Sequence, residues 1–588
     1  MSGHSPLLGV ESSVKGRKWI SRAEQSDVEA MLLRSDILPL TAQLLAGRDV
    51  TSEKVDDFLN PRLKKAMPDP SALADMDKAI AAIFAAIDQN QKICVFADYD
   101  VDGATSAAQL LRWARGIGQE WELYVPDRLL EGYGPSAQAF EQLKTHGTDL
   151  VITVDCGAAA TEALEHASEI GLDIIVIDHH LMGNKIPDAL AVINPNRADD
   201  TSGLGHLAAA GVCFLTVVAL NREAKRRGLS PKTKPLDLLG LAALGTICDV
   251  VPLTGLNRAI VAQGLKVLSR KKDPGIEALA DIAKLSAPFT TSDAGFGFGP
   301  RINAGGRIGV SFMGAEMLST ENAQIAYSHA AELDRVNTER RAIQTRIQTE
   351  AMDEALKLSE DSPILIVSMK DWHAGIIGIV AGRIKDRLDK PAIVIGIDSN
   401  GVGKGSGRSI KGVNLGKALS KAREEGLLLS GGGHEMAGGL TIDPDKIEAF
   451  INFMTSELNK SFAQAKDHKA LKIDSVLHPR AVSLETLDVL EKVAPYGAGN
   501  PTPAFVLPDM LVTFSELLRG GHVRVNAKSR DGTSLRAIAF RADESGLADM
   551  LLSSENHPLH LAGKVQRNEW SGRISADFHI IDAARANM

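Results

Sequence analysis

The chain has 588 residues, of which 44% are hydrophobic and 24% charged, so we expect about three or four folded domains. No apolar run approaches the roughly 20 residues that cross a bilayer, which excludes a membrane-spanning protein. The net charge of −9 argues mildly against nucleic-acid binding, although the local distribution of charge decides that point.

The N-terminal region, residues 1–75, is predicted to be a leader followed by a polar helical segment with a break at Pro61. Residues 1–19 lack the apolar core of a signal peptide. The cysteines at 94, 156, 213 and 248 are scattered and lack CxxC spacing, so neither a thiolate metal site nor a disulfide framework is expected. Reduced thiols and the missing signal predict a cytoplasmic location.

The region 76–320 alternates between helical and strand patterns and is predicted to be an α/β domain. An Ala-rich apolar face predicts a helix at Met76–Asp88. Apolar, β-branched runs predict strands at 92–97, 150–154 and 174–177. Such alternation implies a mostly parallel sheet with helices on both faces.

Each of these strands runs into polar residues at its carboxyl end. In chain order the strand ends carry Asp98, Asp100 and Asp102, then Asp155, then Asp178, His179 and His180. A further apolar stretch at 236–248, a helix or a strand, stops in the same way at Asp249. Because ligands bind at the carboxyl ends of the strands in open α/β sheets, we expect these side chains to share one rim.

Taken singly, each group has a simpler explanation. The segment 98–103 also fits a polar turn closed by glycine, although an EF-hand is excluded because Gln109 stands where that loop needs glutamate. An aspartate such as Asp155 is often a helix N-cap. Adjacent histidines point in different directions, so one can ligate a metal while the other faces a substrate, or both can be ordinary surface residues.

Taken together, the groups predict a metal centre. Many carboxylates with a little imidazole and no thiolate suit Mn²⁺ or Mg²⁺ better than Zn²⁺. The carboxylates suffice for two ions about 3.5–4 Å apart with one carboxylate bridging, an arrangement that hydrolyses phosphate esters with an activated water. The sequence therefore predicts a two-metal phosphodiesterase.

The second half of the chain predicts a connector and two further domains. The segment 295–309 is predicted to be a Gly-rich loop carrying arginines, and 321–360 a long connecting helix, because 321–358 lacks Gly and Pro. A second α/β domain is expected over 361–460. Short alternating runs predict an all-β domain over 466–588.

A series of short motifs follows in a fixed order from about Met76 to the C-terminus. In the first domain they are DYDVDG (98–103), VPDR (125–128), EGYG (131–134), DCG (155–157), DHH (178–180), CDVVPL (248–253) and GPRINAGGR (299–307). Further on they are GKGSGRS (403–409), GGH (432–434), AGG (437–439) and PYGAGNP (495–501). The series resembles the DHH phosphoesterases, and within them the bacterial exonucleases specific for single-stranded DNA.

This resemblance implies roles for individual residues of the first domain. The implied metal ligands are Asp100, Asp102, Asp155, His179 and Asp249, with Asp155 as the bridge. The implied catalytic residues are His180 facing the scissile phosphate, Asp155, and Asp98 in an assisting role. Phe96 departs from the pattern, because many family members have a histidine there, and the expected consequence is that one ion is held less tightly.

The resemblance also implies that the second α/β domain is a substrate-binding, DHHA1-like domain. The implied substrate-binding residues of the chain are Arg128, Arg301, Asn303, Arg307, Ser406, Arg408 and His434. Ser406 and Arg408 would cradle a terminal phosphate. Without the resemblance, 401–409 would be a flexible hairpin turn, His434 a surface histidine, and the arginines of 295–309 solvated.

The C-terminal domain is a candidate OB-fold, a fold that grips single strands with a basic groove and stacking aromatics. Between 519 and 541 the single acid is Asp531, against the basic residues Arg519, Arg524, Lys528, Arg530, Arg536 and Arg541. Phe514, Phe540 and Trp570 are available for stacking. The alternative is a charged, solvated face.

The leading hypothesis is a Mn²⁺- or Mg²⁺-dependent exonuclease that degrades single-stranded DNA from 5′ to 3′ in DNA repair and recombination. The polarity and the DNA preference come from the resemblance. The alternative enzyme is a DHH phosphoesterase for short oligonucleotides or cyclic dinucleotides, and a non-enzymatic alternative is a scaffold without metals. The expected partners are single-stranded DNA, a single-strand-binding protein and a helicase, with no membrane.

Overall fold

The computed structural model describes residues 5–34, 36–128, 131–132, 134–183, 185–358, 362–466, 470–554, 557–570 and 573–586. Contacts divide the chain into two units. The central unit consists of Asn60–Arg340 and Ala494–Pro501. The flanking unit consists of Met1–Leu59, Arg341–Val493 and Thr502–Met588. None of the helices in these described residues is long and apolar enough to cross a bilayer.

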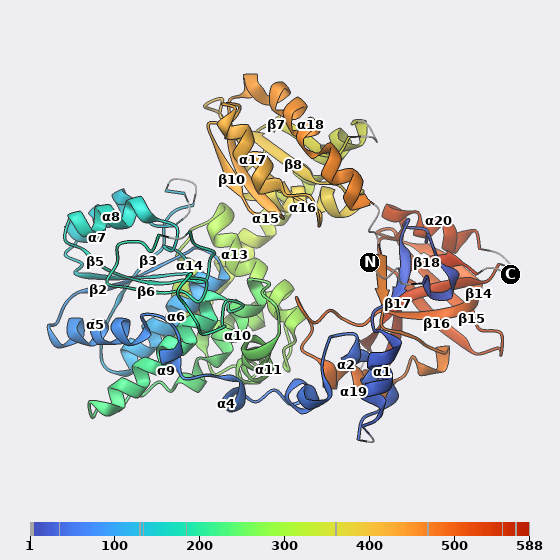
Figure 1. The fold of residues 1–588 in the computed structure, drawn as a ribbon, viewed down its shortest axis with the longest axis horizontal. Coiled ribbons are helices and arrows are strands. Elements are labelled where there is room, and N and C mark those ends of the chain that lie inside the picture. The colour runs from blue at the N-terminus through green and yellow to red at the C-terminus, as the bar shows by residue number, and fades with distance from the viewer. Residues whose placement is uncertain are drawn as a thin grey trace. The chain divides into compact units, whose positions relative to one another are not determined.

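The central unit is built on a parallel sheet. Its strands, in spatial order, are β3 (Glu122–Tyr124), β2 (Ile93–Ala97), β4 (Leu150–Val154), β5 (Asp173–Ile177) and β6 (Ala191–Ile193). In Figure 1, α7 (Ala137–Thr145) and α8 (Thr161–Glu169) lie on one face of the sheet. The other face is covered by α5 (Met76–Asp88), α6 (Val101–Gly116) and α9 (Ala209–Arg226).

Alternate residues of each strand supply the two apolar cores. On β2, Phe96 stacks against Tyr124 with ring centroids 5.1 Å apart and packs beside Phe140 of α7. Val95 and Ala97 point to the opposite core, with the helices α5, α6 and α9. The sheet is therefore buried on both faces, as the unbroken apolar runs predict.

The central unit also contains a group of helices in addition to those that cover the sheet. It comprises α4 (Leu63–Ala66), α10 (Leu239–Cys248), α11 (Gly255–Leu268), α12 (Pro274–Ile282), the π-helical turn η5 (Asp293–Phe298), α13 (Gly299–Ile308) and α14 (Met313–Ser319). The prediction of a Gly-rich loop over 295–309 is wrong, because this segment is helical. Its glycines permit close packing instead: a Cβ at Gly306 would lie 2.9 Å from the Cβ of Tyr99.

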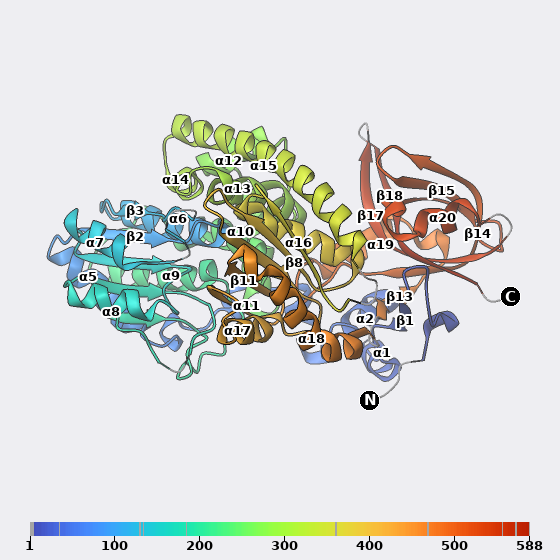
Figure 2. The same ribbon diagram turned by 90° about the horizontal axis from the view of Figure 1, so that it is seen from above.

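The predicted connecting helix is confirmed. It is α15 (Ala323–Lys357), an uninterrupted helix of 35 residues that Figure 2 shows along its length. Its sequence has low helical amphipathicity and many charged residues, which suits a helix with much of its surface in water. The division between the two units falls within it, after Arg340.

The second α/β domain lies in the flanking unit and is also confirmed. Its strands, in spatial order, are β10 (Ser430–Gly433), β11 (Ala437–Ile442), β9 (Gly403–Arg408), β8 (Ala392–Ile397) and β7 (Leu365–Lys370). Its helices are α16 (Ala374–Leu388), α17 (Leu415–Glu424) and α18 (Ile447–Lys466). The alternative of a flexible hairpin turn at 401–409 is wrong for most of these residues, because they form β9. Hydrogen bonds to β8 and β11 on its two sides hold β9 in the middle of the sheet.

The C-terminal domain is the predicted all-β domain, and its sheet closes on itself. Its strands are β13 (Ser475–Val476), β14 (Phe505–Leu518), β15 (His522–Lys528), β16 (Ser534–Ala539), β17 (Leu559–Trp570) and β18 (Arg573–Arg585), with the helices α19 (Leu484–Val493) and α20 (Leu547–Leu552). The pairing of β14 with β17 closes the barrel. This arrangement is the predicted OB-fold.

The N-terminal segment packs on this barrel rather than extending as a leader. Its strand β1 (Lys18–Ser21) pairs in parallel with β12 (Ala470–Ile473), and its helices are α1 (Gln25–Leu32), α2 (Pro39–Ala46) and α3 (Val55–Leu59). Ser13 and Trp19 donate hydrogen bonds of 2.7 and 3.2 Å to the buried carboxylate of Asp582. Sequence reasoning missed β1, because it is short and its partner lies far along the chain.

Candidate metal centre

The first aspartates lie where β2 passes into α6. The strand ends at Ala97, and Asp100 caps α6, because its Oδ1 accepts hydrogen bonds from the backbone N–H groups of Asp102 and Gly103 at 2.8 and 3.1 Å. Gly103 leaves no room for a side chain, since a Cβ there would collide with the carbonyl group of Asp98. Asp98 and Asp100 therefore lie in a strand-to-helix turn, and Asp102 lies in the first turn of α6.

Asp102 is nearly inaccessible and caps a second helix. Its Oδ2 and Oδ1 accept hydrogen bonds from the backbone N–H groups of Ala209 and Ala210, at 2.7 and 2.9 Å, in the first turn of α9. A carboxylate has about four lone-pair positions, so these bonds leave capacity for a cation.

Asp155 follows β4 and is held in a restricted conformation. Its φ is +60°, in the left-handed region that aspartate tolerates better than most residues. Its backbone N–H donates to the carbonyl of Ile177 on β5 at 3.0 Å. Left-handed residues of this kind concentrate at functional sites, where the surrounding structure maintains the strain.

The carboxylate of Asp178, at the end of β5, forms hydrogen bonds with the two histidines that follow it. Its carboxylate accepts hydrogen bonds from the backbone N–H of Ala158 at 2.9 Å and of His179 at 2.7 Å. Its Oδ1 also lies 2.7 Å from Nδ1 of His180. Asp178 thus fixes the orientation of the His180 ring and leaves Nε2 as the nitrogen for other partners.

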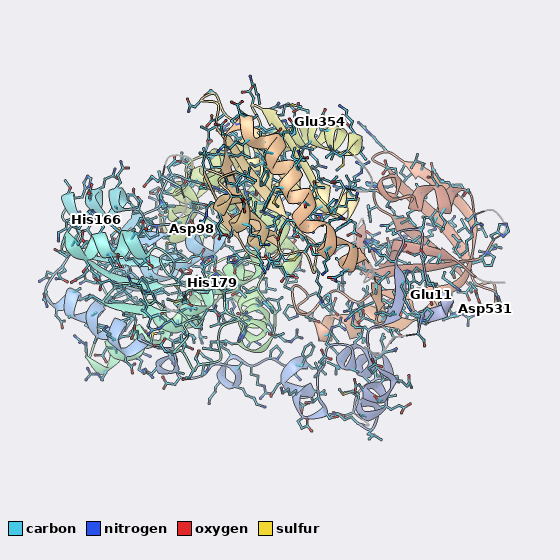
Figure 3. The ribbon with its side chains drawn as sticks, turned by 45° about the horizontal axis from the view of Figure 1, so that its top comes forward. Glu11, Asp98, His166, His179, Glu354 and Asp531 are labelled. Atoms are coloured by element: carbon cyan, nitrogen blue, oxygen red, sulfur yellow. The ribbon has the colours of Figure 1, made fainter. Side chains whose placement is uncertain are left out.

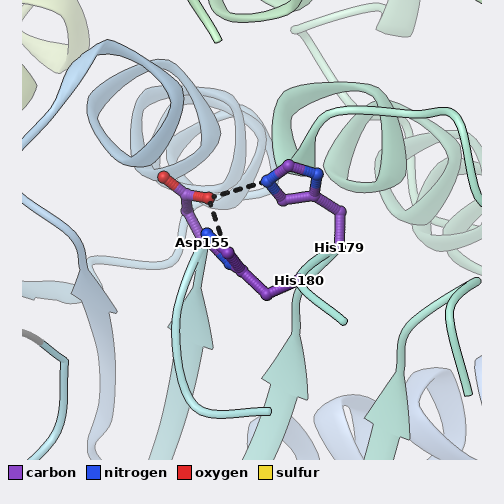
Figure 4. Close-up of side chains that lie close together, drawn as sticks. All are labelled: Asp155, His179 and His180. Carbon is purple, nitrogen blue, oxygen red and sulfur yellow. Dashed lines mark ion pairs between the residues drawn. The ribbon is translucent and has the colours of Figure 1, made fainter. Parts of the chain in front are cut away.

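His179 lies at the middle of the cluster (Figure 4 shows it beside Asp155 and His180). Its Nε2 is 3.4 Å from Asp155 Oδ1, 3.6 Å from Asp249 Oδ2 and 3.8 Å from Asp102 Oδ2. This buried nitrogen makes no hydrogen bond to any residue that the structure describes. Figure 3 labels His179 and Asp98 in this part of the central unit. It also labels His166 of α8, which lies away from them and pairs with Glu141 of α7.

The donor atoms form three overlapping groups, each compact enough for one cation. The groups are Asp98, Asp100 and Asp155; Asp155, His179 and His180; and Asp102, His179 and Asp249. Asp155 and His179 each belong to two groups. Asp155 is common to the first two groups, and His179 is common to the last two.

The buried carboxylates of the cluster repel one another when ionised, so a positive charge among them would be stabilising. Burial raises the pKa of Asp98, Asp102 and Asp155 well above the usual value, and neighbouring carboxylates raise it further. Burial and the charge of Asp100 raise the pKa of Asp249 to about 7. A divalent cation among these groups would reverse the effect by favouring their ionised forms.

The two histidines differ in their protonation. Burial and the charge of His180 lower the pKa of His179, which keeps its ring neutral and able to ligate. Burial also lowers the pKa of His180, but the hydrogen bond and charge of Asp178 outweigh it and leave this pKa above its usual value. An oxygen-rich donor set with one neutral imidazole fits Mn²⁺ or Mg²⁺.

Basic residues gather beside Asp98 and Asp100. The Arg128 guanidinium lies 5.0 Å from the centre of the Tyr99 ring. Burial lowers the pKa of Arg307 to about 10, and the charges of Arg128 and Arg340 contribute to the shift. Sequence reasoning missed Arg340, because it belongs to a helix that the composition predicted to be solvated. Tyr133, in the EGYG motif that follows Arg128, lies outside the described residues.

Two of the implied substrate residues are engaged within the protein. Arg301 pairs with Asp334 of α15 at 2.8 Å and donates to the carbonyl of Gly297 at 2.7 Å. Asn303 Oδ1 accepts from the backbone N–H of Val101 at 3.2 Å, at the start of α6. Both side chains therefore hold α13 against its neighbours, next to the aspartates.

A second cluster lies in the second α/β domain. Ser406 and Arg408 lie two residues apart on β9, and Arg408 Nη1 donates to Ser406 Oγ at 3.1 Å. Both side chains lie beside the first turns of α16, because a Cβ at Gly378 would be 2.8 Å from Ser406 Oγ. His373 caps this helix by accepting from the N–H of Gly375 at 3.1 Å. A hydroxyl and a guanidinium side by side are donors that suit a phosphate.

Sequence reasoning missed His373 and the helix end beside it. The available signal was His373, a polar residue directly before the apolar helix α16. His434, by contrast, is exposed in the turn between β10 and β11. The register of the sheet pairs Ala437 of β11 with Arg408. The turn that carries His434 therefore lies at the end of β9 where Arg408 stands.

The basic residues of the OB domain are exposed. Arg524, Lys528 and Arg536 lie on the outward face of β15 and β16. Acidic residues of the neighbouring strand β14 form ion pairs with basic residues of this region. Glu516 pairs with Arg524 at 2.5 Å, and Asp509 pairs with Arg530 at 3.5 Å.

The exposed aromatic residues of this domain lie among the same basic groups. Phe514 lies 5.9 Å from the Arg524 guanidinium. Phe540 is 53% exposed and packs between His522 and His579, with centroids 5.1 and 5.0 Å apart. The side chain of Trp570 lies outside the described residues.

Comparisons with known proteins agree with this division of the chain. The N-terminal domain of the DHH family matches residues 92–246, the DHHA1 domain matches 361–460, and the RecJ OB domain matches 473–582. Each matched range falls within one of the folded domains described above.

Full-length relatives give the same result. The chain is 34% identical to the single-stranded-DNA-specific exonuclease RecJ of Escherichia coli, over 94% of this chain and 96% of that protein. The crystal structure of RecJ from Thermus thermophilus in complex with Mn²⁺ matches with a TM-score of 0.78 and 27% identity, over 96% of this chain and 78% of that one. The Mg²⁺ complex of that protein matches with a TM-score of 0.74 and 26% identity, over 97% and 78% of the two chains.

Proposed function

This chain belongs to the RecJ family of single-stranded-DNA-specific exonucleases, and we propose that it degrades single-stranded DNA from the 5′ end with Mn²⁺ or Mg²⁺ as its cofactor. The observation that carries the proposal is the buried Nε2 of His179 among the carboxylates of Asp102, Asp155 and Asp249. Of the relatives, the E. coli protein is described as a single-stranded-DNA-specific exonuclease, and the T. thermophilus protein was crystallised with Mn²⁺.

The cations would be held by Asp100, Asp102, Asp155, His179 and Asp249, with Asp155 shared. When bound, they would supply Lewis acidity toward a phosphodiester and its attacking water. Asp98 lies within the same group of donors and adds negative charge without needing to ligate. Phe96, packed against Tyr124 and Phe140 in the core, adds no ligand to this set.

His180 is the residue proposed to contact the scissile phosphate. Its Nδ1 is committed to Asp178, so the ring presents Nε2. The raised pKa of His180 favours a protonated ring, which can donate a hydrogen bond and a positive charge to a phosphate oxygen. Asp178 acts through His180 and is a positioning residue.

The phosphate groups of the strand are proposed to contact two sets of basic residues. Arg128, Arg307 and Arg340 offer guanidinium groups beside the metal ligands, with Arg301 and Asn303 holding α13 in place. Ser406, Arg408 and the N-terminus of α16 are proposed to bind the terminal 5′-phosphate, with His434 nearby. Binding of that terminus would give the enzyme its 5′ polarity.

The OB domain is proposed to hold the strand downstream. Arg524, Lys528 and Arg536 face outward with Phe514 and Phe540 among them, the combination that binds single strands without sequence preference. Because many of these contacts would be to phosphates, binding should weaken as salt rises.

The test is digestion of single strands labelled at the 5′ or the 3′ end, with and without EDTA. The proposal expects early release of the 5′ label as a mononucleotide, no release in EDTA, and recovery with Mn²⁺ or Mg²⁺. Early release of the 3′ label would refute the polarity, and unchanged digestion in EDTA would refute the metal centre. A length series with faster turnover of dinucleotides than of long strands would instead favour the small-substrate alternative.

We also propose that the protein works in the cytoplasm, in DNA repair and recombination, with a single-strand-binding protein and a helicase as partners. The cysteines are free, which fits a reducing compartment. Titration of the purified protein with the single-strand-binding protein of the same organism, followed by calorimetry, tests whether these two proteins bind each other. Absence of heat on mixing would argue against a direct complex.

A further inference from the structure

A short C-terminal segment packs against the central unit near Asp249. The docking segment, Ala494–Pro501, lies between α19 and β14 in the sequence. By its contacts it belongs to the central unit, whereas the residues on both sides of it belong to the flanking unit. It contains the PYGAGNP motif, which the proposed function leaves without a role.

Specific hydrogen bonds hold the docking segment. Ala498 accepts from the backbone N–H of Leu253 at 2.8 Å. The side chain of Arg258, only 3% exposed, donates to the carbonyl of Ala494 at 2.7 Å. Asn500, itself buried, donates to the carbonyl of Pro495 at 2.8 Å and so closes the segment on itself.

The glycines of the segment permit its close approach. A Cβ at Gly497 would lie 2.7 Å from Leu253 Cδ1, and a Cβ at Gly499 would lie 3.1 Å from Pro252 Cβ. Gly499 also has a φ of +73°, which favours glycine. The segment thus touches Pro252 and Leu253 with its backbone, and a larger residue at either glycine would push the two apart.

The contacted residues belong to the turn that carries Asp249. Between them and Asp249 lies Val250, which is 68% exposed and has a φ of +63°. A β-branched residue takes this conformation only where its surroundings impose it. Immediately before it, Asp249 Oδ2 stands 3.6 Å from His179 Nε2. The turn is therefore constrained at both ends, by the metal centre and by the docking segment.

The same contacts reach the other ligands through Asn257. Its buried amide nitrogen donates to the carbonyl of Pro252 at 3.0 Å and to that of His206 at 2.6 Å. A few residues after His206, the first turn of α9 supplies the N–H groups that bind Asp102. Asn257 therefore couples the turn of Asp249 to the segment that orients Asp102.

We infer that the docking segment is a positioning element of the metal centre: by holding the turn 250–253 it sets the place of Asp249 relative to His179 and Asp102. This inference rests on the proposed metal centre. It gives the C-terminal half of the chain a role in metal affinity that is separate from DNA binding. Outer-shell partners of metal ligands commonly change metal affinity by roughly ten- to a hundred-fold when they are removed.

The experiment measures Mn²⁺ affinity by calorimetry on the full chain, without DNA. Arg258→Met removes the bonds to the docking segment, Arg258→Lys retains a donor, and Gly497→Val displaces the segment sterically. Arg48→Met is the matched control, because the Arg48 side chain is also buried but pairs with Asp474 in the flanking unit. Circular dichroism checks the folding of each variant.

We expect Arg258→Met and Gly497→Val to weaken Mn²⁺ binding by roughly ten-fold, Arg258→Lys to recover part of the loss, and Arg48→Met to bind as the wild type does. Nuclease activity of Arg258→Met should return at high Mn²⁺, which a defect in DNA binding would not allow. Wild-type affinity in folded Arg258→Met or Gly497→Val overturns the inference. An equal loss in Arg48→Met also overturns it, by showing a general effect of destabilisation. Failure of the wild type to bind Mn²⁺ overturns the proposed metal centre itself.

Discussion

The metal centre and the OB surface use charge in opposite ways. At the centre, Asp98, Asp102 and Asp155 are almost completely buried, and their like charges lie close together. On the OB surface, Arg524 and Arg536 are exposed, and Glu516 offsets part of the charge. Charges interact strongly in a buried site and weakly in water, where salt screens them.

This difference separates the two kinds of work that an exonuclease needs. A metal site depends on each of its ligands, because the loss of one carboxylate would leave a bound cation with less negative charge and one donor fewer. An exposed basic face spreads its effect over many residues, and each contributes little. Substitutions at the centre should therefore abolish turnover, whereas substitutions on the surface should change affinity and its salt dependence.

The largest effect is expected for Asp155→Asn. It removes the carboxylate shared by two donor groups, so we expect the barrier to hydrolysis to rise by several kcal/mol, on the order of a thousand-fold or more in kcat. Initial rates on a labelled single strand measure the loss, while a gel-shift assay should show retained DNA binding. Asp173→Asn, exposed at the opposite end of β5, is the matched control. Near-wild-type degradation by Asp155→Asn would exclude Asp155 from the metal centre.

A smaller loss is expected for Asp178→Asn. The substitution removes the charge that raises the pKa of His180 and replaces one acceptor oxygen with an amide NH2 donor. We expect kcat to fall by roughly a hundred-fold, the lower end for the loss of one group that stabilises the transition state. Mn²⁺ binding should change little, because Asp178 is outside the donor groups. Calorimetry measures Mn²⁺ binding and single-turnover experiments measure the rate of hydrolysis, so together they check that only the rate falls. A parallel loss of Mn²⁺ affinity would assign Asp178 to the metal shell instead.

Arg408→Met should act on substrate selection. Loss of a charged hydrogen bond to a terminal phosphate costs about 1.5–3 kcal/mol, so the preference for 5′-phosphorylated over 5′-hydroxyl strands should shrink roughly ten- to a hundred-fold. The ratio of kcat/KM for the two strands measures it. Arg387→Met, at the far end of α16, should leave the ratio unchanged. An undiminished ratio in Arg408→Met would refute the phosphate site.

On the OB surface, the expected effects are smaller still. Phe540→Ala should weaken single-strand binding by about 1–3 kcal/mol, the usual contribution of one stacked base. Arg536→Ala should lower the slope of log affinity against log salt by about one. Fluorescence anisotropy over a salt series measures both. If neither variant changes binding, the strand does not follow the face of β15 and β16.

The smallest effect is expected on thermal stability, as a function of pH. Without metal, the folded-state pKa of Asp249 is about 7, above its value in the unfolded chain, so its contribution to stability is lost as pH rises toward that value. A bound cation removes this loss. Mn²⁺ should therefore raise the melting temperature by a few °C more above pH 7 than below it. Differential scanning calorimetry tests this, and a shift independent of pH would contradict it.

Much of the fold was predictable because its signals are local. The helix at Met76–Asp88 and the apolar strands around Val95, Ile152 and Ile175 follow from side-chain periodicity over a few residues. The strand ends were visible for the same reason, so Asp98, Asp155 and His179 were recognisable as neighbours before their distances were known. Glycine was misleading at 295–309, because it permits close packing as readily as it permits a turn.

Other features depend on contacts between distant parts of the chain. The sequence alone contains Arg301, Asp102 and Arg258, but only the tertiary structure pairs them with Asp334, with the first turn of α9 and with the docking segment. Such pairings follow from the packing of whole elements, which no local pattern encodes. The sequence by itself determined which residues are candidates for the chemistry. The tertiary structure decided which of them lie together and which ones hold the others in place.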